Sequence, residues 1–591
     1  MQELDYPFDA EKIIKGKKRL KRQLLESGKA TVKKKIAVLG GYTTSDIVSC
    51  IELFLLNNGI EPVFYESEYD RFYQDAVFDN PELESFAPDI IYICTCVRNI
   101  SAFPKVSDSR ERTDELLNAE AERFRSVWEA LESRYHCPII QNNFEYPLVR
   151  RLGNLDRSDY RGAVNFVSRL NAAFDAYALE HEKFYICDVN YISADYGLKK
   201  WSDPSYWYLY KYAVAVPAIP YLAFNAANII KAIFGKNKKG LVLDLDNTIW
   251  GGVVGDDGAE NLRIGPDTSE GQMYSEFQRY LKGFKDIGVL LNIDSKNDEE
   301  NALQGLNHPD SILKPEDFIV IKANWENKDS NFRAIASELN LGEDSLVFID
   351  DNPAERHIVR EQIPGAGVPE LGDVSSFMTD IDRSGFFETV SLSDDDMKRN
   401  EMYRENIERD KAVRSFSNYD EYLRSLEMKA EIGPFNPLYI QRIAQLTNKT
   451  NQFNLTTRRY TLSEIEDIAD SSDYITLYGK LEDRFGDNGV VSLLIGRKDG
   501  TTCHMDLWLM SCRVLKRDME LAMADVLADK CLEAGITEIV GYYYPTRKNK
   551  MVEDFYASLG FERVSLDEQG NSVWKLPLEG YTHKNTLIEV S

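Results

Sequence analysis

Cysteines are scarce in this chain of 591 residues, and basic residues are outnumbered by acidic ones. Lysine and arginine number 70 against 97 aspartate and glutamate residues, which gives a formal net charge of −27. This charge repels the phosphate backbone of nucleic acids, so nucleic-acid binding is not expected. The 8 cysteines are scattered, mostly within apolar runs, and we expect buried free thiols rather than disulfides or a thiolate metal site.

Long apolar segments are missing as well. No run of about 18 apolar residues is present, and residues 1–5 do not begin a signal peptide. We therefore expect a soluble, cytoplasmic protein with no membrane partner. A hydrophobic fraction of 43% is enough for packed cores, and at about 150 residues per domain the length predicts three or four domains.

Residues 10–35 form the most basic stretch of this acidic chain. The pattern predicts an amphipathic helix whose basic face docks on an acidic neighbouring domain, with an acidic partner protein as the alternative.

Apolar runs alternate with helical patterns through residues 1–235. Strands are expected at residues 36–40, 62–65, 90–94 and 138–143. This alternation predicts an α/β domain with a flavodoxin-like, doubly wound parallel sheet and any site at the carboxyl ends of the strands.

The same region resembles the SGNH-hydrolase fold. Gly41-Tyr42-Thr43 stands where that family has Gly-Asp-Ser, and Asn142 or Asn143 lies near its Asn block. Tyr206 stands where a histidine is expected after Asp203, and no histidine follows before His308. Without a base for the hydroxyl proton, we expect a domain that binds or scaffolds rather than hydrolyses.

The strongest chemical pattern lies in residues 236–395. An apolar strand, residues 240–243, is followed by Asp244 and Asp246, whose side chains face the same way. Two carboxylates so close repel each other unless a divalent cation or functional chemistry offsets the repulsion. The pair therefore predicts a functional site.

Three further polar groups follow in order. Ser295 ends a second apolar run, and its hydroxyl could hold a phosphoryl oxygen. Lys328 supplies a cation for the charge of a transferring phosphoryl group. Asp350 and Asp351 end a third apolar run, and hard oxygen ligands without histidine or cysteine favour Mg²⁺.

This order resembles the haloacid-dehalogenase (HAD) phosphotransferases, whose first motif is Asp-x-Asp-x-Thr. The resemblance implies that Asp244 is the nucleophile, Asp246 the general acid and base, and that Ser295 and Lys328 bind the phosphoryl group. It also implies Mg²⁺ ligation by Asp244, Asp351 and the backbone carbonyl of Asp246, with Asp350 and Glu355 in support. No capping domain fits between the motifs, so a capless, Rossmann-like core with an open site is expected, suited to a large or carrier-borne substrate.

Residues 396–591 contain a linker and a third α/β pattern: a strand at 505–510, a helix at 520–533 and a strand at 538–542. The pattern resembles the GNAT acyltransferase fold. Its pyrophosphate-binding segment would be Arg513 to Asp518, where Lys516 and Asp518 replace small residues. The resemblance leaves Arg513, Lys516 and Arg517 as candidate contacts for the phosphate of phosphopantetheine or CoA; a solvated surface is the alternative.

Residues 448–460, together with the segments 250–255 and 350–355, closely resemble the FkbH-like family of HAD proteins (subfamily IIIC). The leading hypothesis is a Mg²⁺-dependent phosphatase or phosphotransferase that acts through an aspartyl-phosphate on a phosphorylated small acid or carrier-linked substrate. The family implies an alternative: loading of a glyceryl-type acyl unit from 1,3-bisphosphoglycerate onto an acyl carrier protein, for polyketide-type biosynthesis.

One departure bears on that alternative. Asp294 stands where the family typically has the cysteine that carries the acyl thioester, and Cys512 is the nearest substitute by motif context. A third hypothesis is a scaffold whose flanking domains only bind partners. An acidic carrier protein would have to dock on a basic patch such as residues 12–22 or 513–517.

Overall fold

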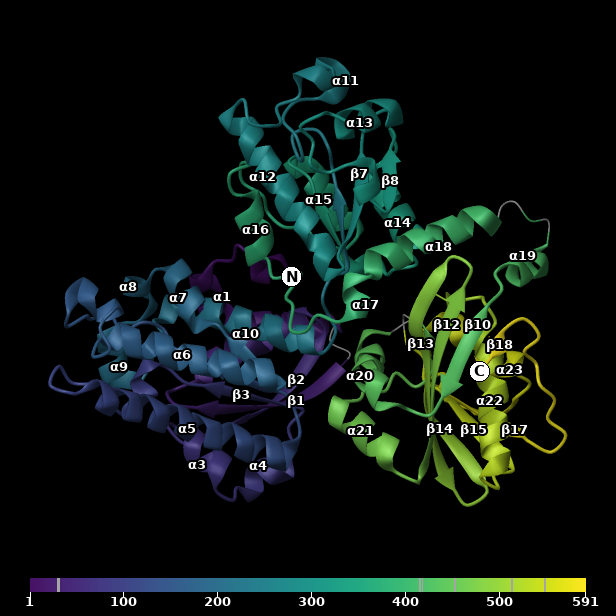
Figure 1. Cartoon of the computed structure of the whole chain (residues 1–591), viewed down its shortest axis with the longest axis horizontal. Helices are drawn as coiled ribbons and strands as arrows, with labels where there is room; N and C mark the ends of the chain where they lie inside the picture. The colour runs from purple at the N-terminus through teal and green to yellow at the C-terminus, as the bar shows by residue number, and fades with distance from the viewer. Residues whose placement is uncertain (29–31, 414–415, 417, 451–452, 512–513, 547–548) are drawn as a thin grey trace. The chain divides into compact units, whose positions relative to one another are not determined.

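Three β-sheets, built from successive stretches of the chain, organise the computed structural model (Figure 1). The structure describes residues 1–28, 32–413, 416, 418–450, 453–511, 514–546 and 549–591. Two compact units result: Met1–Lys236 with Glu388–Val390, and Asn237–Phe387 with Ser391–Ser591. The second unit holds two of the sheets, so the three predicted domains, 1–235, 236–395 and 396–591, stay a prediction.

The first unit contains a five-stranded parallel sheet, which confirms the predicted doubly wound α/β architecture. Ile36–Leu39 and the whole of β3 are buried because helices cover both faces, which is why these strands are continuous apolar runs. In sheet order the strands are β2 (Ile60–Glu66), β1 (Val32–Gly40), β3 (Ile90–Cys94), β4 (Ile139–Asn142) and β5 (Phe184–Cys187).

Two sets of helices cover this sheet. One face packs against α1 (Ala10–Glu26), α2 (Ser45–Asn57) and α10 (Ile219–Ile233). The other packs against α3 (Phe72–Val77), α4 (Pro81–Phe86), α5 (Arg110–Tyr135) and α6 (Ala163–Glu180). The short helices α7 (Val189–Tyr196), α8 (Leu198–Trp201) and α9 (Pro204–Tyr210) follow β5.

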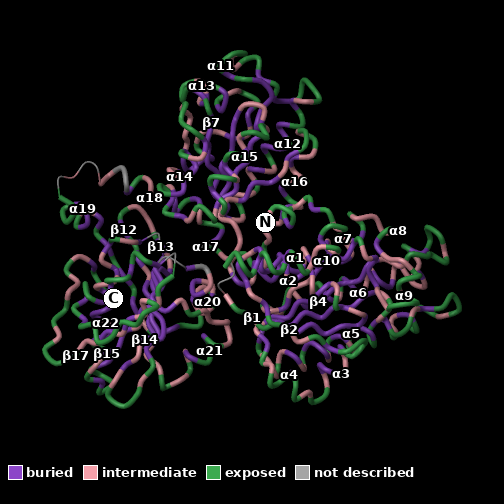
Figure 2. Tube along the Cα trace, turned by 180° about the vertical axis from the view of Figure 1, so that it is seen from behind, coloured by how far each residue is buried: buried purple, intermediate pink, exposed green. Residues whose placement is uncertain are grey.

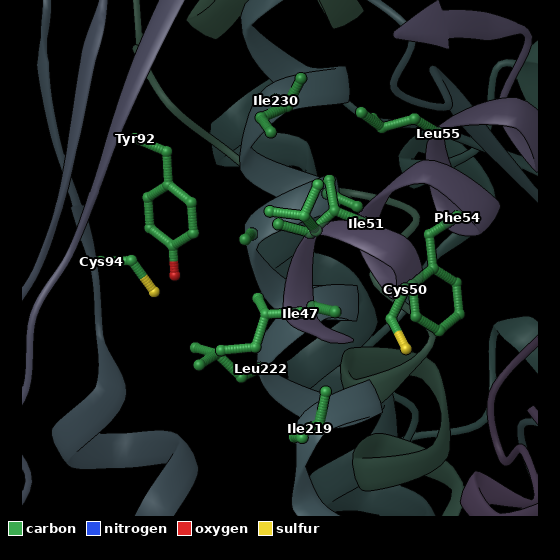
Figure 3. Packing of buried hydrophobic residues seen from close by; sticks show 14 of the residues in the cluster. Ile47, Cys50, Ile51, Phe54, Leu55, Tyr92, Cys94, Ile219, Leu222 and Ile230 are labelled. Carbon is green, nitrogen blue, oxygen red and sulfur yellow. The ribbon is translucent and has the colours of Figure 1, made fainter. Parts of the chain in front are cut away.

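Helices α2 and α10 pack closely in the core. Figure 3 shows Ile47 and Ile51 of α2 beside Leu222 of α10, with Tyr92 and Cys94 of β3 nearby. Among the described residues, one helical stretch, Val216–Ile233, is long and apolar enough to cross a membrane, and 67% of it is buried in the protein. Because most of this stretch is buried against the first sheet, it belongs to the packed core of the unit.

The basic stretch forms α1, as predicted, but it packs within its own unit. Ile13, Leu20 and Leu24 are buried, and Lys21 pairs with Glu52 of α2 at 2.7 Å. Lys17 pairs with Asp46, also on α2. The expected docking of the basic face on a neighbouring acidic domain stays a prediction.

The second unit begins with a four-stranded parallel sheet. In sheet order its strands are β8 (Val320–Ala323), β7 (Leu290–Ser295), β6 (Gly240–Leu243) and β9 (Leu346–Ile349). The helices of this region are α11 (Val254–Asp257), α12 (Ser269–Gly283), α13 (Glu299–Leu306), α14 (Lys328–Glu338), α15 (Pro353–Gln362) and α16 (Phe377–Arg383).

The third sheet is larger and mainly antiparallel. Its ordered path is β16 (Glu562–Leu566), β17 (Ser572–Pro577), β15 (Glu538–Tyr543), β14 (Thr502–Met510), β13 (Gly486–Asp499), β12 (Tyr474–Asp483), β10 (Lys429–Gly433) and β18 (Glu589–Val590), while β11 (Phe453–Asn454) pairs with β14. The helices in this last part of the chain are α17 (Asp394–Met397), α18 (Arg399–Val413), α19 (Tyr419–Ser425), α20 (Ile440–Lys449), α21 (Leu462–Asp470), α22 (Met519–Glu533) and α23 (Phe555–Ser558).

Helix α22 belongs to the apolar cluster on one side of this sheet, whereas α20 and α21 contribute to a separate cluster. The predicted strands at 505–510 and 538–542 and the helix at 520–533 are confirmed as β14, β15 and α22.

Burial follows the sheets, as the buried trace along β4 and β7 in Figure 2 shows. Seven cysteines among the described residues are free and buried, as predicted, while Cys512 lies outside the described residues.

Candidate active site

The carboxyl ends of three adjacent strands meet in the four-stranded sheet. Leu243 of β6 is in register with Ile293 of β7 and with Ile349 of β9. The residues that directly follow these positions are Asp244, Asp294 and Asp350. Parallel strands in this register bring their next side chains to one edge, which is where open α/β sheets bind ligands.

A lysine joins two of these carboxylates. Lys328, the first residue of α14, is 3% exposed, and its Nζ lies 2.7 Å from an oxygen of Asp244 and 2.7 Å from an oxygen of Asp350. Burial disfavours the charged ammonium, but the two carboxylates outweigh it and raise the pKa of Lys328. Burial and the charge of Asp244 raise the pKa of Asp350 to about 6, against the opposing effect of Lys328.

Three carboxylates form a cluster that suits a divalent cation. Asp244, Asp350 and Asp351 each offer an oxygen, and these oxygens lie within 4.8 Å of one another. Thr248 orients Asp351, since its hydroxyl lies 3.3 Å from Asp351 Oδ1 and accepts the Asp351 backbone N–H at 3.1 Å. A set of hard oxygen donors fits Mg²⁺.

The predicted ligand set differs in detail from this cluster. Asp244 and Asp351 lie in it as expected, and Asp350, expected only in support, is a full member. Glu355 pairs with Lys296 at 2.7 Å. The carbonyl of Asp246 as a ligand stays a prediction.

Asp246 lies at the same edge, but its carboxylate is turned toward protein donors. Oδ1 accepts the Trp250 Nε1–H at 2.9 Å and the Val254 N–H at 3.1 Å, and Oδ2 accepts from Asn297 Nδ2 at 3.0 Å. Burial raises the pKa of Asp246, and the hydrogen bonds from Val254 and Trp250 partly offset this effect. A raised pKa suits a group that must both give and take a proton.

Sequence reasoning missed Trp250 and Asn297 as partners of Asp246. The signal available was position alone: Trp250 follows Asp246 by four residues, and Asn297 follows Ser295 by two.

Ser295 ends β7 and is 1% exposed. Its neighbour Asp294 is fully buried and accepts from Asn331 Nδ2 at 3.1 Å. Burial is the main reason that the pKa of Asp294 rises to about 8, so near neutral pH this side chain is largely a neutral carboxylic acid.

Two of the three predicted cofactor residues of the C-terminal region, Lys516 and Arg517, lie among the described residues. Arg517 is 7% exposed and donates to Asp483 at 3.1 Å and to Asn406 at 2.8 Å, which argues against a cofactor role for it. Lys516 is exposed, and its carbonyl accepts from Tyr419 at 2.6 Å. Arg513 lies outside the described residues.

The predicted N-terminal motif residues form internal contacts. The Thr43 hydroxyl donates to the carbonyl of Tyr210 at 2.8 Å. Asn142 accepts from Tyr92 at 2.7 Å, and Asn143 donates to Asp188 at 2.8 Å. Among the described contacts of Thr43 there is no base that could activate its hydroxyl, so hydrolysis is not supported here.

Two comparisons with known proteins place this geometry in a family. Residues 35–231 match the family model described as FkbH, N-terminal domain. A crystal structure of the N-terminal part of the protein BF1531 from Bacteroides fragilis, described as containing a phosphatase domain complexed with Mg, is 32% identical, with a TM-score of 0.58. The match covers 64% of this chain and 99% of that one. The chain belongs to the FkbH-like family.

The same findings support a HAD-type phosphatase in this FkbH-like chain. Other solved structures match about a quarter of it. They include the ribosomal-protein-S18-alanine N-acetyltransferase from Escherichia coli, 11% identical with a TM-score of 0.20, covering 25% of this chain and 94% of that one. Ard1 from Thermoplasma volcanium is 19% identical with the same TM-score, covering 25% and 97%. A TM-score of 0.20 is too low to support a conclusion about this chain. No curated protein matches the chain.

Proposed function

We propose that this FkbH-like protein is a Mg²⁺-dependent phosphatase or phosphotransferase that works through an aspartyl-phosphate. One observation carries the proposal: Asp244 forms an ion pair with the buried Lys328, and one of its carboxylate oxygens lies in a cluster with oxygens of Asp350 and Asp351. Asp244, Asp350 and Asp351 would hold the cation, which when bound supplies positive charge beside the transferring phosphoryl group.

Each residue of the site has its own role in the two chemical steps. A carboxylate oxygen of Asp244 forms a bond to phosphorus as the bond from phosphorus to the leaving oxygen breaks, and Asp246 gives its proton to that oxygen. Lys328 and Ser295 hold the phosphoryl oxygens. Asp246, now a carboxylate, then takes a proton from water while the water oxygen bonds to phosphorus. The bond to Asp244 breaks, which releases inorganic phosphate and restores both side chains.

Of the two substrate classes considered, a phosphorylated small acid and a carrier-linked substrate, an open site favours the carrier-linked one. The segment after Asp246 contains only the short helix α11 and a 3₁₀ turn at Ala259–Asn261 before α12 begins. Between β7 and Lys328 the chain forms α13, a 3₁₀ turn at Pro315–Asp317 and β8. Neither insertion is large enough for a capping domain.

Replacement of the nucleophile tests the proposal. Purified protein should release phosphate from para-nitrophenyl phosphate when Mg²⁺ is present and not when EDTA is added. Asp244→Asn should lower kcat by more than about a thousandfold. The exposed Asp256, in the same loop region, provides the matched control, and Asp256→Asn should retain the rate. Undiminished Mg²⁺-dependent turnover by Asp244→Asn would refute the mechanism.

A second candidate function, transfer of a glyceryl-type acyl unit from 1,3-bisphosphoglycerate to an acyl carrier protein, rests on family membership. Residues 188–502 contain no cysteine, and the buried carboxyl of Asp294 precedes Ser295. An acyl thioester on this domain would therefore have no thiol to form on. Intact-mass measurement of a holo carrier protein incubated with 1,3-bisphosphoglycerate separates the two functions, because loading adds mass to the carrier and hydrolysis releases phosphate alone.

A further inference from the structure

The carboxyl group of Asp246 is held by donors from two separate segments. Trp250 and the backbone N–H of Val254, the first residue of α11, come from the segment that follows β6, and Asn297 comes from the loop between β7 and α13. All three bonds lie between 2.9 and 3.1 Å. This is good hydrogen-bond geometry for N–H donors, so the plane of the carboxyl group is fixed by three contacts.

The two oxygens of Asp246 are not equivalent. Oδ1 accepts two N–H donors, which occupy both of its lone-pair directions. Oδ2 accepts one donor, from Asn297, and keeps one direction available. The asymmetry leaves Oδ2 as the oxygen that can bind a proton without breaking a hydrogen bond.

We infer that Asn297 and Trp250 are positioning residues that orient Asp246 so that its Oδ2 faces the leaving oxygen. The inference rests on the proposed phosphatase function and adds to it a reason why Asp246 can serve as the acid. Catalytic geometry of this kind must be held closely, and a displacement of about 1 Å can cost a hundredfold in rate.

Packing holds both positioning residues in place. Trp250 is fully buried, and its ring lies against Gly305 of α13, where an added Cβ would meet the ring at 2.7 Å. Asn297 is 4% exposed. Neither side chain has room to turn away from Asp246 without moving its neighbours.

The inference assigns a specific step to these contacts. As the bond from phosphorus to the leaving oxygen breaks, the electron pair goes to that oxygen and the proton on Asp246 Oδ2 moves to it, leaving Asp246 a carboxylate that still accepts from Asn297. When the leaving group is poor, this proton is needed most. When it is a stable anion, the bond breaks with little assistance.

A comparison of leaving groups tests the inference. Values of kcat/KM, which report phosphorylation of Asp244, are measured with Mg²⁺ for phenyl phosphate, a poor leaving group, and para-nitrophenyl phosphate, a good one. Asn297→Ala and the similarly sized Asn297→Leu, which both remove the N–H donor without adding charge, should lose at least about tenfold with the first substrate and less than about threefold with the second. Trp250→Phe, which keeps a ring and removes the Nε1–H, should shift in the same direction.

Asn307→Ala is the matched control, because Asn307 donates to Leu303 at 2.9 Å on the exposed end of α13. Its kcat/KM should match the unchanged protein for both substrates. Equal losses on both substrates in the Asn297 variants, or no loss, would overturn the positioning role alone. No turnover of either substrate by the unchanged protein would overturn the proposed function and the positioning role with it.

Discussion

The ammonium nitrogen of Lys328 lies 2.7 Å from a carboxylate oxygen of Asp244. Both groups are largely buried, and the second carboxylate partner of Lys328, Asp350, is completely so. The lysine therefore stabilises the carboxylates of the site before any ligand arrives, and the same positive charge is available to a phosphoryl group that reaches Asp244.

Removal of the Lys328 charge should weaken both stability and catalysis. Lys328→Met leaves the clustered carboxylates uncompensated, which should lower the free energy of unfolding by about 3–5 kcal/mol in EDTA. Mg²⁺ should restore more stability to this variant than to the unchanged protein, while kcat/KM falls about a hundredfold or more. Thermal unfolding with and without Mg²⁺, together with phosphate release, measures these effects.

Lys322→Met provides the control for that experiment, because Lys322 pairs with Glu338 toward the surface of the same sheet. Its loss of stability should be below about 1 kcal/mol. Equal unfolding temperatures for the two variants would show that Lys328 does not hold the carboxylate cluster together.

Glu145 should make the first unit less stable as the pH rises. This side chain is 6% exposed, and its carboxyl group accepts from the backbone N–H of Val97 at the long distance of 3.4 Å. Burial raises its pKa to about 7, from an ordinary value of 4.5. Between these two values the folded protein holds a proton that the unfolded chain has released, so stability falls as pH rises through this window.

Glu145→Gln removes this titration and keeps the shape of the side chain. Relative to the unchanged protein, the variant should gain up to about 3 kcal/mol between about pH 5 and about pH 8. Urea unfolding at both pH values, with the exposed Glu129→Gln as control, measures the difference. Parallel stability curves for Glu145→Gln and the unchanged protein would contradict the prediction.

Asp483 should be essential for the packing of α18 against the large sheet. Its buried carboxylate accepts from Arg409 Nη2 at 2.7 Å and from Arg517 Nη1 at 3.1 Å. Asp483→Asn removes the carboxylate charge that the two buried guanidinium groups of Arg409 and Arg517 share, and it should cost about 3–5 kcal/mol in chemical unfolding. Glu533→Gln breaks the exposed pair with Lys530 and should change stability by less than about 1 kcal/mol. Similar losses in both variants would rule out a special role for the buried network.

The arrangement of Asp244, Asp294 and Asp350 could be predicted from the sequence because each follows an apolar run. A buried parallel strand leaves a local pattern, and the polar residue at its end must lie at the sheet edge. Lys328 could be predicted because it lies between Ser295 and Asp350 in the chain, the order in which the HAD motifs occur. Strand-end position and motif order can both be read directly from the sequence.

Contacts between distant segments could not be predicted in this way. Arg517 stands in a basic run that resembles a phosphate-binding helix start, but its partner Asp483 is 34 residues away and buried. The basic face of α1 gave no sign that Lys21 would pair with Glu52 of α2. Asn297 likewise reaches Asp246 from 51 residues away. In each case the partner depends on how elements pack, which residue types alone do not determine.

Gly305 should matter for catalysis although it contacts no reacting atom. A Cβ at this position would lie 2.7 Å from the buried ring of Trp250, closer than two carbon atoms can approach. Gly305→Ala should therefore shift Trp250 and its bond to Asp246, even though alanine favours the helix by about 1 kcal/mol. We expect kcat/KM for phenyl phosphate to fall by about tenfold or more, with a smaller loss for para-nitrophenyl phosphate. At Gly283, near the end of α12, an added Cβ would meet no neighbouring atom within 4 Å. Gly283→Ala should therefore leave both values of kcat/KM unchanged and should leave stability unchanged or raise it slightly. If Gly305→Ala behaved as Gly283→Ala does, the ring of Trp250 could move without consequence and would not be what holds Asp246 in place.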